Sequence, residues 1–424
     1  MAATNVPTTL NGLFKEIYAD RVENLVPEAA KIVKMIPFVP RDKEIGNKYH
    51  QPVILSWEHG MTYAAFNAGA FALNSSVALD MQDAQVSSSQ MLLRSQISYD
   101  AAARAANSKK AFVKATELLV ENMMESMTKR VEIACLYGVS GIGEADSSSN
   151  VDTTHTVVTF TAGGWATGIW AGMEGALIQF YTVAGDALVS SGADSIFTID
   201  SVDVDNKAIT VSGTTTGITA LDIALAAGNS NVFFNGAHGN EMAGLDKIIT
   251  NTGTLFNISA TSYNLWKGNT YSAASAALTI GKLLAAVAKA VNRGLDEKAG
   301  VLVSPVTWAN LMSDLAALRR FDGSYDRKKL ENGASAITFY SQNGELEIIA
   351  HNIVKEGEAF IIPTKKCKRI GATDVTFRTP GMEDEQFFRQ LTDNAGFELR
   401  AYTDQAIFLE CPARATKVTN IVNT

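Results

Sequence analysis

The sequence predicts an α+β protein with an extended β-hairpin loop, one long helix and an inserted small β-barrel or sandwich domain. Three observations along its 424 residues lead to this prediction. Residues 46–99 form an aromatic stretch that is interrupted by glycine and has no helical period, whereas residues 108–137 carry one apolar stripe at helical spacing. Residues 151–235 then form an acidic series of short strand-like segments, and a mixed α/β region follows.

The first 45 residues predict an arm. Residues 10–20 and 28–35 have the spacing of two short amphipathic helices, and Pro37 and Pro40 then impose an extended path. We expect this arm to pack on something outside itself, such as a neighbouring subunit.

Residues 46–107 predict an extended loop. Alternation of apolar and polar residues predicts strands over 48–57 and 90–99, which we expect to pair as a hairpin with a long tip. A lone hairpin is marginally stable in water, so we expect its apolar side chains to be covered by another subunit. The alternative is a hairpin that packs inside its own domain. The side chains proposed for contact between subunits are Trp57, Met61, Tyr63, Phe66 and Phe71.

A helix of about 30 residues is predicted over 108–137, with Asn107 and Ser108 as its cap and Gly138 after its end. Its stripe is Phe112, Ala115, Leu119, Met123, Met127, Val131 and Cys135. Charged residues, among them Lys129, Arg130 and Glu132, are expected on the remaining surface. A coiled coil is disfavoured because the steps are mostly four, without the alternation of three and four.

The block that follows is read as β structure. After a polar loop over 144–155, we expect strands at 156–161, 176–183, 196–204 and 208–211. In the last third, a helix is expected over 273–292, and Pro305 is expected to start another. Strands are expected at 299–304, 336–340, 345–351 and 359–363, and a long strand pair at 396–411 before a polar tail.

Charge and composition restrict the function classes. The formal net charge is −8, and residues 151–235 carry eight acids against Lys207, a net charge of −7. We therefore expect a solvated acidic module and no sequence-specific nucleic-acid binding. The apolar stretch at 280–291 is too short for a membrane span, and no secretion signal is visible. Cys135, Cys367 and Cys411 are far apart, which predicts buried free thiols in a reducing compartment.

Motifs for catalysis, cofactors and metals are not found. The five histidines are scattered without the spacing of a metal site. The sequence from Gly138 to Ile142, GVSGI, lacks the last glycine of a nucleophile elbow, and glycines that follow a helix do not fit a dinucleotide motif. We therefore expect no enzyme, no cofactor and no metal.

Two basic clusters are candidates for contact with phosphates or with a neighbour's acids. One is Arg319, Arg320, Arg327, Lys328 and Lys329, and the other is Lys365, Lys366, Lys368 and Arg369. The alternative is a pair of solvated loops.

Two segments carry a resemblance to a known family. The stretch VLVSPVTWANLMSDLAAL at 301–318 and the run at 344–363, which ends GEAFIIP, resemble segments of the major capsid protein of tailed bacteriophages. The order of elements along the whole chain resembles that family too. The resemblance implies an arm (1–45), an extended loop (46–107), a spine helix with the start of a peripheral domain (108–150), an inserted acidic β domain (151–235), a peripheral return (236–274), an axial domain (275–390) and C-terminal peripheral strands with a tail (391–424).

What the resemblance implies about function is self-assembly. Hexamers and pentamers of the chain would form an icosahedral shell around double-stranded DNA, in a virion assembled in the host cytoplasm. The implied partners are further copies of the chain, a separate scaffolding protein, a portal protein and non-specifically contacted DNA, with a decoration protein left open and no membrane. Two alternatives remain at this point: an encapsulin-like nanocompartment shell, and a hydrolase with a β accessory domain.

Overall fold

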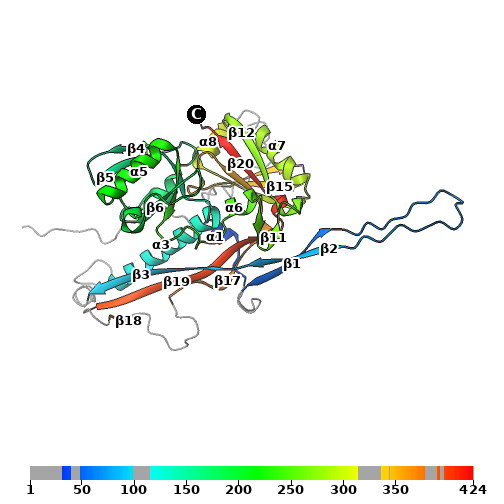
Figure 1. Ribbon diagram of the computed structural model, residues 1–424, viewed down its shortest axis with the longest axis horizontal. Helices are drawn as coiled ribbons and strands as arrows, with labels where there is room; N and C mark the ends of the chain where they lie inside the picture. Colours follow the sequence, from blue (N-terminus) through cyan, green and yellow to red (C-terminus); the bar gives the residue numbers. More distant parts are fainter. Residues whose placement is uncertain are drawn as a thin grey trace, which may run out of the picture.

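The computed structural model describes residues 31–39, 48–98, 115–313, 336–342, 344–377, 389–391 and 396–423. A helix and a long thin sheet run side by side along the base of the molecule, two lobes stand on them, and a narrow hairpin projects to one side (Figure 1). The predicted cap at Asn107 and Ser108 and the residue Phe112 lie outside the described residues. All members of the first basic cluster also lie outside them: Arg319, Arg320, Arg327, Lys328 and Lys329.

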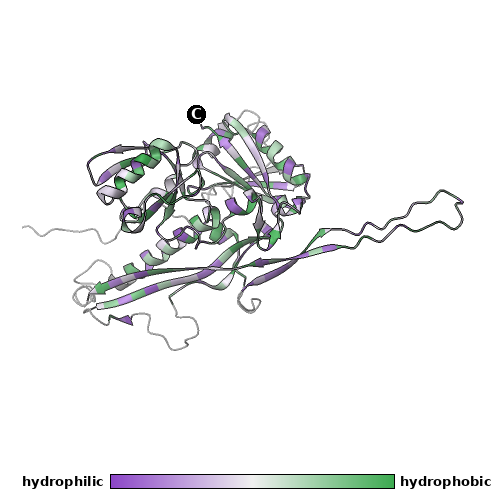
Figure 2. Cartoon of the chain, viewed as in Figure 1, coloured by the Kyte–Doolittle hydropathy of each residue, from purple (hydrophilic) through white to green (hydrophobic). Residues whose placement is uncertain are grey.

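The long helix is α3, Ala115–Tyr137, and it packs on a four-stranded sheet. The strands of this sheet are β3 (Ser89–Ser98), β17 (Cys367–Thr376), β18 (Arg389–Gln390) and β19 (Gly396–Leu409). The predicted stripe is confirmed where it is described: Met123 and Met127 pack on Leu399 and Ala401, and Val131 and Cys135 are buried. Hydrophilic and hydrophobic residues alternate along β3 and β19 (Figure 2), as expected for strands with one covered face.

Gly138 follows the end of α3 as predicted, but glycine is needed at this position for a different reason. A left-handed cap was expected there, but the left-handed residue is Val139, at φ 70°. A Cβ on Gly138 would lie 2.1 Å from the carbonyl oxygen of Met242, so glycine is needed for close approach of two backbones.

The predicted hairpin pairs differently from the expectation. Strand β1 (Tyr49–Ser56) pairs with β2 (Asp80–Val86), and β3 pairs instead with β19 along ten residues. The sequence of β2, DMQDAQV, has few residues with high strand propensity, so it was not recognised as a strand. Because β3 pairs with β19, its side chains cover the apolar stripe of α3. If β3 paired with β1 in the projecting hairpin, it could not reach this stripe.

A second lobe contains a six-stranded mixed sheet with the order β12-β20-β16-β13-β15-β14. Helices α7 (Ile280–Val291) and α8 (Pro305–Ser313) pack on it. The strands are β12 (Asn269–Ala276), β13 (Ala299–Val303), β14 (Ala336–Ser341), β15 (Gly344–Ala350), β16 (Ala359–Pro363) and β20 (Thr416–Ile421).

Three expectations for this region are wrong. Residues 273–276 end a strand and do not start the helix, 396–409 form one strand and not a pair, and the expected polar tail forms β20. Strand β20 lies between β12 and β16 in the interior of the sheet, where Val418 is fully buried. Its polar residues were misleading because partners in the fold satisfy them, as with Lys417 and Asp246 of helix α6 (Leu245–Thr250).

The other lobe is a closed barrel with the order β4-β5-β8-β7-β6-β9. Its strands are β4 (Gly143–Asn150), β5 (His155–Phe160), β6 (Leu177–Thr182), β7 (Phe197–Asp203), β8 (Ala208–Ser212) and β9 (Ser230–Phe234). The expected loop at 144–155 is therefore largely the strand β4. The sequence reading also missed helix α5 (Thr215–Ala227), which Thr214 caps by accepting the N–H of Gly217.

Short elements fill the junctions between these parts: α4 (Thr167–Trp170), β10 (Thr254–Leu255) and β11 (Ile258–Ser259). Near α4, in the core of the barrel lobe, the rings of Trp165 and Trp170 stack on each other and the ring of Phe160 packs tilted against both.

A buried carboxylate connects the arm, the long helix and the six-stranded sheet. Glu132 of α3 is fully buried and accepts the backbone N–H groups of Lys31 and Val33, both at 2.8 Å, and that of Ile32. These N–H groups begin helix α1 (Ile32–Met35), where no carbonyl of the helix can reach them. His351, which follows β15 and is also fully buried, donates its Nε2–H to the same carboxylate at 2.8 Å.

Arg369 fixes the arm at a second point. Its Nε donates to the carbonyl of Ile36 at 3.0 Å, and its guanidinium also binds Asp374 and Gln405. The arm therefore enters the fold between a helix and the long sheet, anchored by one buried anion and one buried cation.

We expect Glu132→Ala to lower the free energy of unfolding by about 3–5 kcal/mol, because the substitution leaves three backbone donors and His351 without their acceptor. Denaturant unfolding of the purified protein measures this change. Glu121→Ala, at an exposed position of the same helix, is the matched control, with an expected change within about 0.5 kcal/mol. Equal stability of the two variants would contradict the role given to Glu132.

Candidate subunit interface

The long tip of the β1–β2 hairpin exposes an unusual number of large apolar side chains. Exposed fractions are 76% for Trp57, 87% for Tyr63 and 96% for Phe66, and Met61, Phe71 and Leu73 are more than half exposed. Glu58 is the one acidic or basic residue (Asp, Glu, Lys or Arg) between positions 57 and 79. Exposed apolar surface of this extent makes the tip a candidate contact site.

Polar contacts hold the backbone of this tip in shape. His59 N–H donates to the Val77 carbonyl at 3.2 Å, and the side chain of Asn74 donates to the Met61 carbonyl at 2.9 Å. Left-handed backbone at Asn67 and Gly69 turns the chain. The tip thus has a defined backbone while its apolar side chains lack cover within the described chain.

The base of the hairpin is attached to the body. Tyr263 donates its hydroxyl to Asp80 at 2.7 Å, and this hydrogen bond lowers the pKa of the Asp80 carboxyl. The rings of Tyr49 and Phe408 meet edge to face, and Gln85 N–H donates to the Phe256 carbonyl. The hairpin therefore projects from a fixed base (Figure 1).

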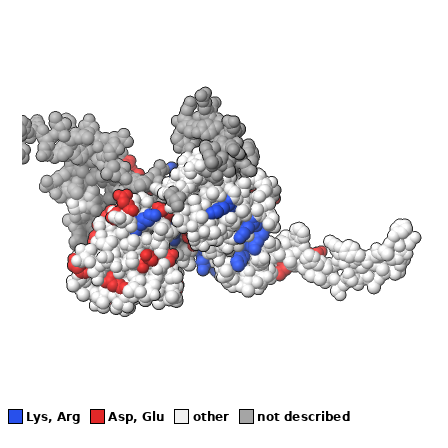
Figure 3. Space-filling model, turned by 90° about the horizontal axis from the view of Figure 1, so that it is seen from above, with Lys and Arg blue, Asp and Glu red and all other residues white. Residues whose placement is uncertain are grey.

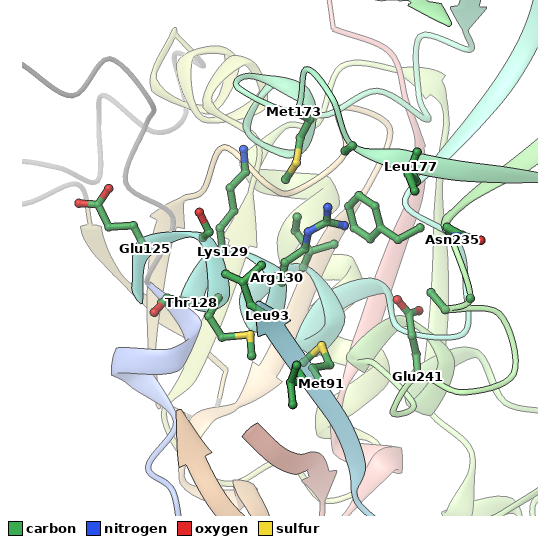
Figure 4. Close-up of a pocket in the computed structure, with 18 of the residues that line it drawn as sticks. Met91, Leu93, Glu125, Thr128, Lys129, Arg130, Met173, Leu177, Asn235 and Glu241 are labelled. Atoms are coloured by element: carbon green, nitrogen blue, oxygen red, sulfur yellow. The ribbon is translucent and has the colours of Figure 1, made fainter. Parts of the chain in front are cut away.

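A groove of about 1040 Å³ lies where α3, β3 and the barrel meet. Its apolar lining includes Met91, Met127, Met173, Leu177 and Phe234 (Figure 4). We call this space the methionine groove. Thioether side chains adapt to many shapes, and methionine-lined surfaces are used to bind partner segments.

Two cations of α3 project into the methionine groove (Figure 4). Lys129 donates to the carbonyl of Ala171 at 2.6 Å, and burial lowers its pKa to about 8. The guanidinium of Arg130 lies over the ring of Phe234, and burial lowers its pKa to about 10. Burial also raises the pKa of Glu241, which accepts the N–H of Val139.

The barrel lobe carries the acidic surface. On the face seen in Figure 3, acidic side chains gather over this lobe, while Lys and Arg side chains lie mainly over the other. Acids such as Asp152 and Asp203 are exposed in turns, where hydrogen bonds from backbone N–H groups lower their pKa values.

Most of the second basic cluster is paired with acids of the same chain. Lys366 and Lys368 both pair with Glu410, and Arg369 is buried on Asp374. Only Lys365 of this cluster is exposed. These side chains contact β17 and the arm within the chain, and their contact with an external anion stays a prediction.

Sequence reasoning placed Glu132, Lys129 and Arg130 on the solvated face of the helix. A signal was present for Glu132: it interrupts the apolar run from Val131 to Tyr137, and a lone charge in such a run predicts a buried partner. No comparable signal marks Arg130, because the groove around it is built from segments far apart in the sequence.

The described residues contain no cluster of side chains suited to a metal ion. Among the described helices, none has the length and apolarity to cross a membrane.

Comparison with known proteins shows that this chain is similar in structure to several solved proteins. No protein-family model matches the chain, and no curated protein sequence matches it either. The capsid protein of cyanophage A-1(L) matches with a TM-score of 0.55 at 11% identity, covering 98% of this chain and 99% of the other. The capsid of a native GTA particle matches with a TM-score of 0.52 at 7% identity, covering 99% and 100%. The fold is therefore that of phage capsid proteins.

An encapsulin, holo-SrpI from Synechococcus elongatus PCC 7942, matches at 9% identity over 100% of this chain and 98% of the other. A TM-score of 0.43 is too low for this similarity to distinguish an encapsulin shell from a phage capsid.

The lowered pKa of Lys129 predicts that the folded protein becomes more stable as the pH rises into the alkaline range. Its pKa is about 8 in the folded chain, against an ordinary value of 10.5. Between these values the unfolded chain holds more protons at this site, so stability increases with pH. Relative to Lys129→Met, we expect the wild type to gain about 2 kcal/mol between pH 8 and 10.5. Denaturant unfolding of both proteins over that range measures the gain, and parallel curves would contradict it.

Proposed function

We propose that this chain, which has the fold of tailed-phage capsid proteins, is a major capsid protein whose hexamers and pentamers form an icosahedral shell around double-stranded DNA. We further propose that assembly takes place in the host cytoplasm with a separate scaffolding protein and a portal protein. The chain would then act as a structural component of the virion and not as an enzyme.

The observation that carries this proposal is the apolar tip of the hairpin. Burying one large apolar side chain stabilises a contact by about 1.5–3 kcal/mol. Trp57, Met61, Tyr63, Phe66 and Phe71 are all exposed on one projection whose base is fixed. A closed shell covers such a surface in every copy, because each subunit both supplies a tip and receives one.

Charge supports an orientation of the subunit in the shell. The block from 151 to 235 has a net charge of −7, which would repel packaged DNA. We therefore place the barrel on the outer surface as an inserted domain. Arg319, Arg320, Arg327 and Lys328 remain proposed contacts with a neighbour's acids.

Electron microscopy of the purified protein, with and without scaffolding protein, tests the proposal. Closed shells or regular tubes are expected. Particles that enclose an enzyme and no DNA would identify an encapsulin-like compartment. A protein that stays monomeric or dimeric under all conditions would contradict both the capsid and the compartment function.

Phe66→Ala should impair assembly and leave the subunit stable. Phe66 is 96% exposed, so we expect its loss to change the free energy of unfolding by less than about 0.5 kcal/mol. Each contact between subunits should lose about 1.5–3 kcal/mol, which light scattering detects as a higher critical concentration for assembly. Ile223→Ala, at a position 66% exposed on α5, is the control and should assemble normally. Unfolding of the isolated Phe66→Ala subunit would instead place the tip inside its own fold.

The outward position of the barrel predicts cleavage in intact particles. The turn at Gly185 and Asp186 is exposed and left-handed. An aspartate-specific protease should cut there before the shell is disrupted, and mass spectrometry of the fragments locates the cut. Complete protection of this turn, with cleavage elsewhere, would argue for an internal barrel.

A further inference from the structure

Lys417 of β20 lies against two carboxylates in the interior of the molecule. Its Nζ contacts Oδ1 of Asp246, in the first turn of α6, and lies 2.7 Å from Oε1 of Glu358, which directly precedes β16. Lys417 pairs with Phe360 between β16 and β20, so Glu358, two residues before Phe360, is on the same face of the sheet. Helix α6 contacts β20 and brings Asp246 to this face.

These three side chains are largely removed from water. The side chains of Lys417 and Asp246 are 8% and 11% exposed, and the fully buried ring of Phe360 lies 5.8 Å from the Lys417 Nζ. Burial lowers the pKa of Lys417, but the charges of Glu358 and Asp246 outweigh it and hold this pKa above its ordinary value. The resting state is therefore a buried ion pair, and burying its charges costs free energy that a neutral group would not cost.

Another lysine of the described chain has two acidic neighbours in water. Lys298 lies 2.8 Å from Glu347 and 3.9 Å from Glu345, but its side chain is 38% exposed. Water solvates and screens the charges of such a pair. Burial, and not the presence of two acids alone, therefore distinguishes the site around Lys417.

A lysine held between two carboxylates in a dry site has the groups that amide formation requires. Glu358 can take a proton from the Lys417 Nζ along their 2.7 Å contact, which leaves a neutral amine. The amine lone pair then attacks Cγ of Asp246, one bond from the oxygen that Nζ already contacts. The proton on Glu358 and a second proton of the amine pass to the departing oxygen, which leaves as water. Glu358 ends as the carboxylate it was at the start.

The reaction removes one cation and one anion from the interior and leaves one of each. Lys355 is buried beside the same carboxylates, and its Nζ donates to the carbonyl of Gly141 at 2.9 Å. Burial lowers the pKa of Lys355, and the charges of Glu358 and Asp246 counteract this. Once Lys417 and Asp246 are joined, Lys355 and Glu358 remain as one base and one acid. Because the Lys355 amine is held by Gly141, Lys417 is the nucleophile.

We propose that Lys417 and Asp246 form an isopeptide bond within the chain, with Glu358 as the catalytic acid and base. The bond joins α6 to β20, the last strand of the described chain, which lies between β12 and β16 inside the six-stranded sheet. A covalent link between such distant segments restricts the unfolded chain, as a disulfide does. The bond lies within one subunit, so the inference goes beyond the proposed shell and does not depend on it.

Mass spectrometry of the denatured, full-length protein tests the bond. We expect the chain to be lighter than its sequence by one water. Trypsin should not cut after Lys417, and the digest should contain a branched peptide that joins residues 208–247 to residues 415–424. A mass equal to that of the sequence, with normal cleavage after Lys417, would overturn the proposal.

Variants separate the bond from a purely structural ion pair. Lys417→Arg keeps a cation but cannot form this amide, so we expect it to lose no water. Asp246→Asn should lose ammonia in place of water, because the amine then displaces the amide nitrogen. Glu358→Gln should slow bond formation about 100-fold or more, as followed by mass during cell-free synthesis. Glu347→Gln, beside the solvated Lys298, is the matched control and should react like the wild type.

Two further outcomes would contradict the assignment. Loss of water from Lys417→Arg would place the dehydration elsewhere in the chain, for example at a cyclised aspartate. A wild-type rate in Glu358→Gln would remove that carboxylate from the reaction. Circular dichroism checks that each variant is folded, and the peptide map of the wild type decides the matter even where a variant is not.

Discussion

The carboxylate of Glu132 is the interaction on which the arrangement of this subunit depends. Moving an isolated charge into a protein interior costs several kcal/mol, and the cost is offset only when hydrogen bonds surround the charge. Here three backbone donors come from the arm and one imidazole from beyond β15. One side chain of α3 therefore fixes the arm, the long helix and the six-stranded sheet relative to each other, and none of them can shift without exposing an unpaired group.

A close backbone contact between two glycines sets the barrel lobe against this frame. A Cβ on Gly357 would lie 2.6 Å from the Cα of Gly163. An ion pair of 2.6 Å between Lys207 and Glu356 joins the same two lobes. The barrel is thus held by contacts that leave no room for side chains, and its edge forms one wall of the methionine groove.

Aromatic side chains occupy two opposite environments in this fold. Trp165 and Trp170 are fully buried and stack in the core of the barrel lobe, whereas Trp57 and Phe66 are exposed to solvent on the hairpin tip. Apolar surface stabilises whatever removes it from water. The first pair therefore stabilises the subunit, while the second remains available for a contact outside it.

The spacing of apolar residues along the sequence was enough to predict those helices and strands that have one apolar face. The stripe of α3, the helix beginning at Pro305 and the strand Ala299–Val303 were predictable, since spacing along the chain shows which face is apolar. The exposed tip residues were also predictable as a group. Spacing does not show what covers an apolar face, and only the tertiary structure decided that β3 pairs with β19, with Arg94 bound to Glu398 304 residues away. Burial of Glu132, placement of β20 inside a sheet and the groove around Arg130 were decided in the same way, because each is built from segments whose contacts are long-range.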